Sequence, residues 1–302
     1  MTPLYMLAMD QRLWLKKAVF GTLDLDGART AELVTLKQVI ADGAIEAVRS
    51  GVDAASAAVL IDEELGGDAP ARLKQAGLTV SMALEKSQDC VYEEEPRSVS
   101  GELLREHRPD LPKVLVRYNP EVADATAREQ LRALASTSDR VAAAGLPFLV
   151  ELLVIPTEEQ VRRAGSPERF DSDVLPGLTL TAIDHIKDAG VRARYWKVEG
   201  MPDADRFAEV LRRCRAGVED EVDAVVLGKA ASQERVERWL NDAAAAGFTG
   251  FAIGRSIWWQ ALQDLRAGEI DRPEAVRRIA DLYVRNCEVM ASAMGEQAAV
   301  LG

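Results

Sequence analysis

The sequence predicts an α/β protein with a single (βα)8 TIM barrel that spans residues 1–302. Three observations support this fold. Eight short apolar runs alternate with longer amphipathic segments, no Pro/Gly/Ser-rich linker divides the chain, and no Gly-rich phosphate turn of the GxGxxG or GxxxxGKS/T type occurs. The main alternative is an open, doubly wound sheet, which normally carries such a turn after an early strand.

The eight predicted strands are short apolar runs bounded by polar or turn residues. They begin near positions 4, 57, 78, 113, 147, 194, 222 and 248, with the sequences LYMLAMD, AAVLIDE, LTVSMALE, KVLVRYN, PFLVELLV, RYWKVEG, VDAVVLG and FTGFAIG. One amphipathic helix is expected after each strand, and several of these helices end at a glycine, as in ATAREQLRALASTSDRVAAAG. The stretch DRPEAVRRIADLYVRNCEVMASAM predicts the last helix. In such a barrel the functional site lies at the C-terminal ends of the strands.

The charge balance restricts the class of partner. The chain has 37 Lys and Arg against 49 Asp and Glu, a net charge of −12, which disfavours nucleic acid and anionic membranes. No apolar run reaches the roughly 18 residues of a transmembrane helix, and the N-terminus has aspartate and arginine where a signal peptide needs its cleavage region. We therefore expect a cytoplasmic protein with a small-molecule substrate. Assembly as a homo-oligomer stays open.

Disulfide and metal chemistry are not expected. The three cysteines, Cys90, Cys214 and Cys287, are odd in number and far apart, which fits neither a disulfide framework nor a CxxC metal site. The two histidines, His107 and His185, fall in separate helical stretches, which argues against a histidine-based zinc site. We expect reduced cysteines, no metal and no other cofactor.

Strand alternation places charged side chains inside the predicted barrel. Lys113 and Arg117 share one face of KVLVRYN, Glu151 lies on one face of PFLVELLV, and Lys197 and Glu199 share one face of RYWKVEG. The opposite faces are apolar and suit the interface with the helices. Three consecutive strands therefore bring two lysines and a glutamate together, where burial of an unpaired lysine costs several kcal/mol and lowers its pKa.

Such a cluster suits amine chemistry, so Lys113, Glu151 and Lys197 are the candidate catalytic residues. A lysine with a lowered pKa can add to a carbonyl carbon and form a Schiff base. A neighbouring carboxylate can move protons during this step, and a second ammonium lowers the pKa of the nucleophile further. These are the parts of a metal-free aldolase. The alternative is an internal ion-pair network that fills the lower barrel.

Further polar residues follow the other predicted strands, and more than one role is open to them. An acidic residue there could bind sugar hydroxyls or cap the next helix, and for Glu63 and Glu64 capping or solvation is the favoured role. An arginine could hold an anionic group or form an ion pair with Asp10 or Asp62. The candidate substrate-binding residues are Asp10, Gln11, Arg12, Asp62, Lys86 and Arg117.

The last two predicted strands end in VVLGKAAS and GFAIGRSIWW. Each places a glycine and then a cation directly before a helix, where backbone N–H groups and a positive side chain suit a phosphate group. Each motif is weak alone, because glycine is common in loops. As a pair after strands seven and eight, Gly228 with Lys229 and Gly254 with Arg255 favour phosphate binding.

Taken in order, eight runs of the sequence resemble the class I aldolases related to tagatose-1,6-bisphosphate aldolase. These runs are LAMDQR, LIDEELG, LEKS, KVLVRYNP, PFLVELLV, YWKVEG, VVLGKAAS and GFAIGRSIWW, from about Leu4 to Met290. The chain is most similar to the aldolase-like domain fused behind the sugar kinase of bacterial inositol catabolism, which is associated with 5-dehydro-2-deoxyphosphogluconate aldolase. The resemblance implies a barrel whose Schiff-base lysine is Lys197.

The same resemblance implies the roles of other residues. Lys113 matches the second lysine, Glu151 matches the proton-transferring glutamate, and Asp10 and Gln11 match the element at the substrate. The implied phosphate-binding residues are Leu227, Gly228, Gly254 and Arg255. Two positions depart from the inositol-type pattern, which usually reads DHR at Asp10-Gln11-Arg12 and LGR at Leu227-Gly228-Lys229. The glutamine is instead similar to that of tagatose-bisphosphate and sulfosugar-phosphate aldolases.

The implied reaction is the reversible cleavage of a phosphorylated ketose to dihydroxyacetone phosphate and an aldehyde. The aldehyde would be malonate semialdehyde if the substrate is the inositol intermediate. Transaldolase-type transfer and cleavage of another sugar phosphate or sulfosugar are the neighbouring alternatives. A non-catalytic barrel that binds a sugar phosphate is the alternative of another class, and it predicts no covalent adduct at Lys197.

Overall fold

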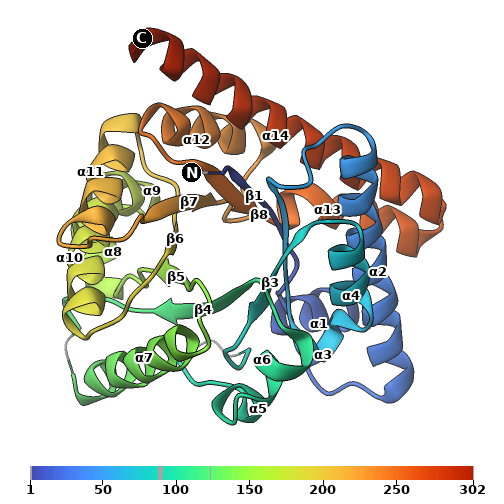
Figure 1. The fold of residues 1–302 in the computed structure, drawn as a ribbon, viewed down its shortest axis with the longest axis horizontal. Coiled ribbons are helices and arrows are strands. Elements are labelled where there is room, and N and C mark those ends of the chain that lie inside the picture. The colour runs from blue at the N-terminus through green and yellow to red at the C-terminus, as the bar shows by residue number, and fades with distance from the viewer. Residues whose placement is uncertain (1, 88–90, 123, 302) are drawn as a thin grey trace.

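Eight parallel strands close into a barrel in the computed structural model, which describes residues 2–87, 91–122 and 124–301 (Figure 1). The strands follow one another around the barrel in chain order, and Leu4 of the first lies opposite Gly250 of the last. The predicted (βα)8 barrel is confirmed, and the open sheet is wrong. The strands are β1 (Leu4–Ala8), β2 (Ala57–Ile61), β3 (Thr79–Ala83), β4 (Leu111–Arg117), β5 (Leu149–Leu153), β6 (Tyr195–Val198), β7 (Asp223–Leu227) and β8 (Gly250–Ile253).

Helices surround the barrel on its outside (Figure 1). One helix per strand was too simple an expectation, because β1, β2, β3, β5 and β8 are each followed by more than one. The short helices α4, α5 and α9 carry a proline in their first turn, which favours a helix start in segments too short to show amphipathic periodicity. The helices are α1 (Leu13–Phe20), α2 (Gly27–Arg49), α3 (Glu63–Gly66), α4 (Ala69–Gln75), α5 (Pro96–Val99), α6 (Glu102–His107), α7 (Ala125–Ala143), α8 (Glu158–Ala164), α9 (Pro167–Arg169), the π-helix η1 (Phe170–Val174), α10 (Leu175–Asp188), α11 (Ala204–Arg215), α12 (Gln233–Ala245), α13 (Arg255–Ala267) and α14 (Arg272–Leu301).

Strand alternation divides the core into two apolar layers. Side chains on the outer faces of the strands, such as Val114 and Trp196, pack with the helices. The inner faces form a smaller apolar cluster that includes Leu4, Met6 and Leu149. Along the strands, the predicted charged residues come after this inner cluster and toward the C-terminal ends. The inner cluster therefore fills the barrel on the N-terminal side of the charged residues.

The last helix, α14, packs on the outside of the barrel. It packs against α2, α12 and α13, and Figure 1 shows it running along one side of the molecule. Its buried Tyr283 hydroxyl donates a hydrogen bond to the backbone oxygen of Tyr5, 2.5 Å away. Among the described helices, α14 included, there is none with both the length and the hydropathy that a membrane span requires.

The cysteines that the structure describes are buried in the apolar layers. Cys214 and Cys287 are free thiols, and burial raises the pKa of each well above its usual value. A buried thiol that resists ionisation is a poor nucleophile and metal ligand. Cys90 lies outside the described residues.

Candidate active site

Strands β4, β5 and β6 place the three candidate catalytic side chains next to one another inside the barrel. Glu151 lies opposite Lys197 in the strand register. Its Oε1 atom is 2.9 Å from Nζ of Lys197, and its Oε2 atom is 2.9 Å from Nζ of Lys113. All three side chains are at most 10% exposed. One buried carboxylate therefore bridges two buried amines, an arrangement that agrees with strand alternation.

Lys113 is surrounded by carboxylates. Besides Glu151, its Nζ atom contacts Asp10 and Glu85, each at 2.7 Å. Burial opposes the charge of this ammonium, but the three carboxylates outweigh it and raise the pKa of Lys113 well above its usual value. The expectation that burial lowers a lysine pKa therefore does not hold for Lys113, because this lysine is paired. It is a permanent cation at neutral pH.

The carboxylates around Lys113 respond in different directions. Burial opposes ionisation of Glu151, yet Lys113 and Lys197 together lower its pKa. The same balance lowers the pKa of Asp10. For Glu85, burial prevails over its attraction to Lys113 and raises the pKa. Glu151 is thus an ionised carboxylate in direct contact with the Lys197 amine, which suits a group that accepts and returns protons.

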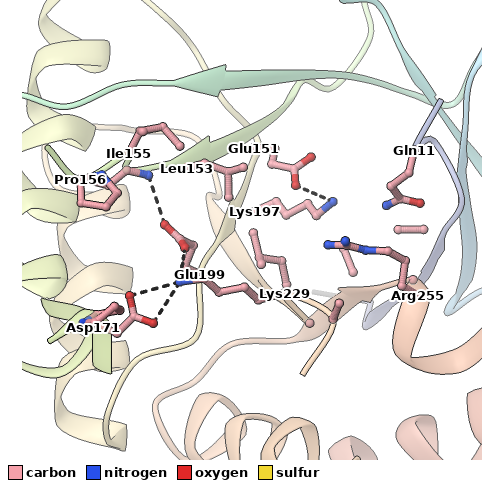
Figure 2. Close-up of a pocket in the computed structure, with 18 of the residues that line it drawn as sticks. Gln11, Glu151, Leu153, Ile155, Pro156, Asp171, Lys197, Glu199, Lys229 and Arg255 are labelled. Carbon is pink, nitrogen blue, oxygen red and sulfur yellow. Dashed lines mark hydrogen bonds and ion pairs between the residues drawn. The ribbon is translucent and has the colours of Figure 1, made fainter. Parts of the chain in front are cut away.

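A cavity of about 460 Å³ opens beside this cluster. Figure 2 shows Lys197 and Arg255 reaching into it from two sides, while Glu199 and Lys229 lie at its other end. Apolar side chains, including Leu153, form much of the wall. Such a mixture of apolar wall and few polar groups is typical of small-molecule sites.

A smaller cavity of about 270 Å³ shares Gln11, Glu151 and Arg255 with the first. Its wall also contains Asp10, Arg12, Lys86 and Arg117, so five of the six candidate substrate-binding residues line it. The Oδ1 atom of Asp10 and the Oε1 atom of Gln11 are buried and lack a hydrogen-bond partner among the described residues. A buried acceptor without a donor is costly, so both atoms suit a ligand that brings hydroxyl groups.

The ends of β7 and β8 form one wall of the larger cavity, where Leu227, Gly228, Gly254 and Arg255 all lie. Glycine is required at Gly254, because a Cβ atom there would lie 2.3 Å from the backbone oxygen of Ala8. Helix α13 begins directly after this glycine, which brings its unpaired first N–H groups to this wall. The Arg255 guanidinium lies over the Trp14 ring, 5.0 Å from its centroid. Burial lowers the pKa of Arg255, which nevertheless remains a cation.

Lys229, the other predicted phosphate-binding cation, already has two carboxylate partners. Its Nζ atom is 3.0 Å from Glu199 and 3.1 Å from Asp171. Burial opposes its charge, but these two carboxylates raise the pKa of Lys229. Burial raises the pKa of Glu199 in spite of the nearby Lys229 ammonium. The Glu199 carboxylate also accepts a hydrogen bond from the backbone N–H of Val154 at 3.1 Å. The charge of Lys229 is therefore compensated within the protein.

Two further predicted cations are paired in the same way. Arg12 is buried and pairs with Glu95 at 3.0 Å, and it also donates to the backbone oxygen of Glu85. Of the roles left open for Arg12, direct pairing with Asp10 or Asp62 is not seen in the described structure. Lys86 is 41% exposed and lies 2.8 Å from Glu93. Arg12 and Lys86 therefore line the smaller cavity as cations that the protein's own carboxylates already neutralise.

Asp62 corrects one expectation for substrate binding. It is completely buried, forms an ion pair with Lys37 of α2, and accepts a hydrogen bond from the backbone N–H of Leu65 at 2.8 Å. It thereby caps α3, and it is not among the described residues that line the two cavities. The capping role, which was open for acidic residues at this position, accounts for the hydrogen bond from Leu65, and Lys37 neutralises the buried carboxylate. Glu63 and Glu64 follow it in the first turn of α3, where an acidic residue is favourable.

Four residues of the site were not among the sequence candidates: Trp14, Glu85, Asp171 and Glu199. Glu85 was noticed as a polar residue closing the third predicted strand, with sugar binding or helix capping open to it, and it continues the inward alternation of Ser81 and Ala83 just past the end of β3. Glu199 was placed on the inward face with Lys197 but received no role. Asp171 comes from η1 in the long connection between β5 and β6, where no periodicity indicates direction.

Comparison with solved structures shows the same fold at low sequence identity. The protein Cgl0159 from Corynebacterium glutamicum matches with a TM-score of 0.57 and 19% identity, covering 93% of this chain and 85% of its own. A fructose-bisphosphate aldolase from Plasmodium falciparum matches with a TM-score of 0.60 and 15% identity, covering 97% and 91%. An archaeal fructose-1,6-bisphosphate aldolase, with its catalytic lysine covalently bound to the carbinolamine intermediate, matches with a TM-score of 0.56 and 14% identity, covering 93% and 94%.

Sequence comparison gives the family. Among curated proteins, none matches the chain. The family described as uncharacterized protein conserved in bacteria, DUF2090, matches residues 1–293, almost the whole sequence. The chain therefore belongs to the DUF2090 family.

Proposed function

We propose that the protein is a Schiff-base aldolase that acts on a phosphorylated ketose, with Lys197 as the nucleophile. One observation carries the proposal: a buried carboxylate, Glu151, lies 2.9 Å from each of two buried lysines at the edge of a cavity large enough for a sugar phosphate. A nucleophilic amine, a base in contact with it and an adjoining cavity are what imine chemistry needs. The fold shared with the fructose-bisphosphate aldolases supports the same reaction class.

Lys197 would begin the reaction by adding its Nζ atom to the ketone carbon. Glu151 takes one proton from the Lys197 ammonium, which frees the amine for this addition. A second N–H proton moves to the ketone oxygen and gives the carbinolamine, and Glu151 then returns its proton to that hydroxyl, which leaves as water and gives an iminium ion. Lys113 favours this sequence because its fixed positive charge helps to keep Glu151 ionised. Lys113 itself transfers no proton, since its three carboxylates hold its own proton firmly.

Carbon–carbon cleavage would follow from the iminium ion. With carbons counted from the chain end nearer the ketone, the bond between C3 and C4 breaks, its electron pair moves toward the iminium nitrogen, and the C4 hydroxyl gives its proton to Glu151. The C4 half leaves as an aldehyde and the other half remains on Lys197 as an enamine. Protonation of the enamine carbon by Glu151 and addition of water then release dihydroxyacetone phosphate and return Lys197 as an ammonium beside the ionised Glu151. Atoms and charges balance without any cofactor.

The remaining candidates would hold the substrate. The Arg255 guanidinium and the backbone at Leu227, Gly228 and Gly254 suit the phosphate group. The unpartnered acceptors of Asp10 and Gln11 suit hydroxyl groups near the bond that breaks, and Arg117 lies in the wall beyond them. Among phosphorylated ketoses, the overall sequence resemblance points to 5-dehydro-2-deoxyphosphogluconate, whose cleavage gives malonate semialdehyde, whereas Gln11 and Lys229 depart from that pattern. Transfer of the enamine to a second aldehyde would be a transaldolase reaction of the same site.

Reductive trapping tests the proposal. Wild-type protein treated with dihydroxyacetone phosphate and borohydride should gain the mass of one reduced adduct, located on Lys197 by peptide mapping. Lys197→Met should give no adduct, and Glu151→Gln should slow adduct formation about 10²–10⁴-fold. Lys74→Met is the matched control, because this lysine pairs with Asp110 and lies outside the lining of both cavities, and it should be labelled like wild type. An adduct that persists in Lys197→Met would show that the nucleophile is wrong, and no adduct in wild type would favour the non-catalytic barrel.

A further inference from the structure

The cations that reach the two cavities differ in whether the protein already neutralises them. Arg12 pairs with Glu95, Lys86 with Glu93, and Lys229 with both Glu199 and Asp171. Arg117 also has an interaction partner. Arg255 differs from them, because no ion pair joins it to a carboxylate in the parts of the chain that the structure describes, and its guanidinium rests on the Trp14 ring.

Lys229 lies at the end of the larger cavity away from Arg255, as Figure 2 shows. Glu199 and Asp171 both contact its ammonium, and Glu199 is 6% exposed. Two carboxylates against one ammonium give this end of the cavity a net negative charge. A second phosphate placed there would meet like charges, which strongly disfavour binding.

We infer that Glu199 and Asp171 are specificity-determining residues, which neutralise Lys229 and so restrict the site to ketoses with one phosphate group, held at Arg255. The inference rests on the proposed aldolase function for its substrate, but the number of bound anions can be measured without the reaction. The two carboxylates come from separate segments, since Glu199 directly follows β6 and Asp171 belongs to η1, so either can be changed while the other stays. Without them, Lys229 would become an uncompensated cation in the same cavity and a second anion site.

Titration with inorganic phosphate by calorimetry tests the anion count. Wild-type protein should bind one phosphate, and Arg255→Gln should lose it. The double variant Asp171→Asn/Glu199→Gln should bind two. Asp173→Asn is the matched control, since this exposed neighbour of Asp171 contacts Ser172 rather than Lys229 and should bind one phosphate. If the double variant does not fold, Asp171→Asn alone provides the test, because Asp171 is the more exposed of the two carboxylates. This single variant should bind a second phosphate, more weakly than the double variant would.

Kinetics with two related ketoses provide the second test. Wild type should cleave fructose 1-phosphate with a kcat/KM at least about tenfold above that for fructose 1,6-bisphosphate, and Asp171→Asn/Glu199→Gln should reduce this ratio by about tenfold. Two phosphates bound by wild type, or one bound by the folded double variant, would overturn the inference. A failure of the aldolase proposal looks different, because no ketose would then form an adduct at Lys197 while the phosphate counts could still differ between variants.

Discussion

At the scale of single residues, the two lysines of the barrel interior differ in their carboxylate partners. Among the residues that the structure describes, Lys113 has three carboxylates within 2.9 Å, whereas Lys197 has one. Three carboxylates around one ammonium leave an excess of negative charge beside Lys113. This excess can stabilise a positive charge that forms nearby. Such an arrangement suits a reaction in which Lys197 becomes a cationic iminium ion. It also makes the fold depend on Lys113.

Lys113→Met tests this dependence. We expect the substitution to lower the free energy of unfolding by about 3–5 kcal/mol, because Asp10, Glu85 and Glu151 lose the cation they share in a buried site. Urea unfolding at pH 7 measures the loss. At pH 4 the loss should be smaller, since protonated carboxyl groups repel one another less. Lys86→Met, which removes an exposed pair, should leave the unfolding curve nearly unchanged. A wild-type unfolding curve for Lys113→Met would show that the cluster does not need this ammonium.

At the scale of secondary-structure elements, the close packing of α2 against α14 opposes the helix propensity of one residue, Gly43. Gly43 lies in the middle of α2, where alanine would favour the helix by about 1 kcal/mol. A Cβ atom at this position would, however, lie 2.4 Å from Cγ2 and 2.8 Å from Cβ of Ile279 in α14. The second atom cannot move without the helix backbone, so the two helices would have to separate.

Gly43→Ala should therefore destabilise the protein, by about 1 kcal/mol or more once the overpacking cost exceeds the gain in helix propensity. Gly177→Ala in α10 is the matched control, because nothing lies within 4 Å of the added methyl group there. It should stabilise by about 0.5–1 kcal/mol. Thermal and urea unfolding of both variants check the opposite signs. If both variants gain stability, α14 does not hold α2 at the close distance described.

The elements that sequence could predict are those with a period. The alternation in KVLVRYN, PFLVELLV and RYWKVEG predicted both the strands and the inward direction of Lys113, Glu151 and Lys197, since a strand has a period of two and one face must be apolar. The short helices after the strands have fewer than two turns, so their period could not be recognised. The partners of Lys229 could not be predicted either. Its contact with Asp171 depends on the path of the β5–β6 connection, which no local pattern fixes.

At the scale of the whole molecule, the barrel encloses a charged network within a strongly acidic chain. The chain has a net charge of −12, yet its interior holds both lysines of the candidate site. Buried charges link folding to protonation, because a group whose pKa differs between the folded and unfolded states makes stability depend on pH. Asp10 is a clear case, since it is buried, contacts Lys113 at 2.7 Å and has a lowered pKa.

The direction in which stability changes with pH follows from the lowered pKa of Asp10. Burial alone would disfavour the Asp10 carboxylate, but Lys113 and Lys197 hold its pKa below the ordinary value of 3.8. The stability that ionised Asp10 contributes is therefore fully present above that value and is lost as pH falls through the lower, folded-state pKa. Asp10→Asn removes this contribution at every pH. Wild type and Asp10→Asn should thus differ most in urea midpoint at pH 6–7, by an amount equivalent to about 2 kcal/mol or more, and should converge as pH falls toward 3 and below. A constant difference across this range would mean that Asp10 stabilises the barrel through packing or neutral hydrogen bonds, and not through its charge beside Lys113.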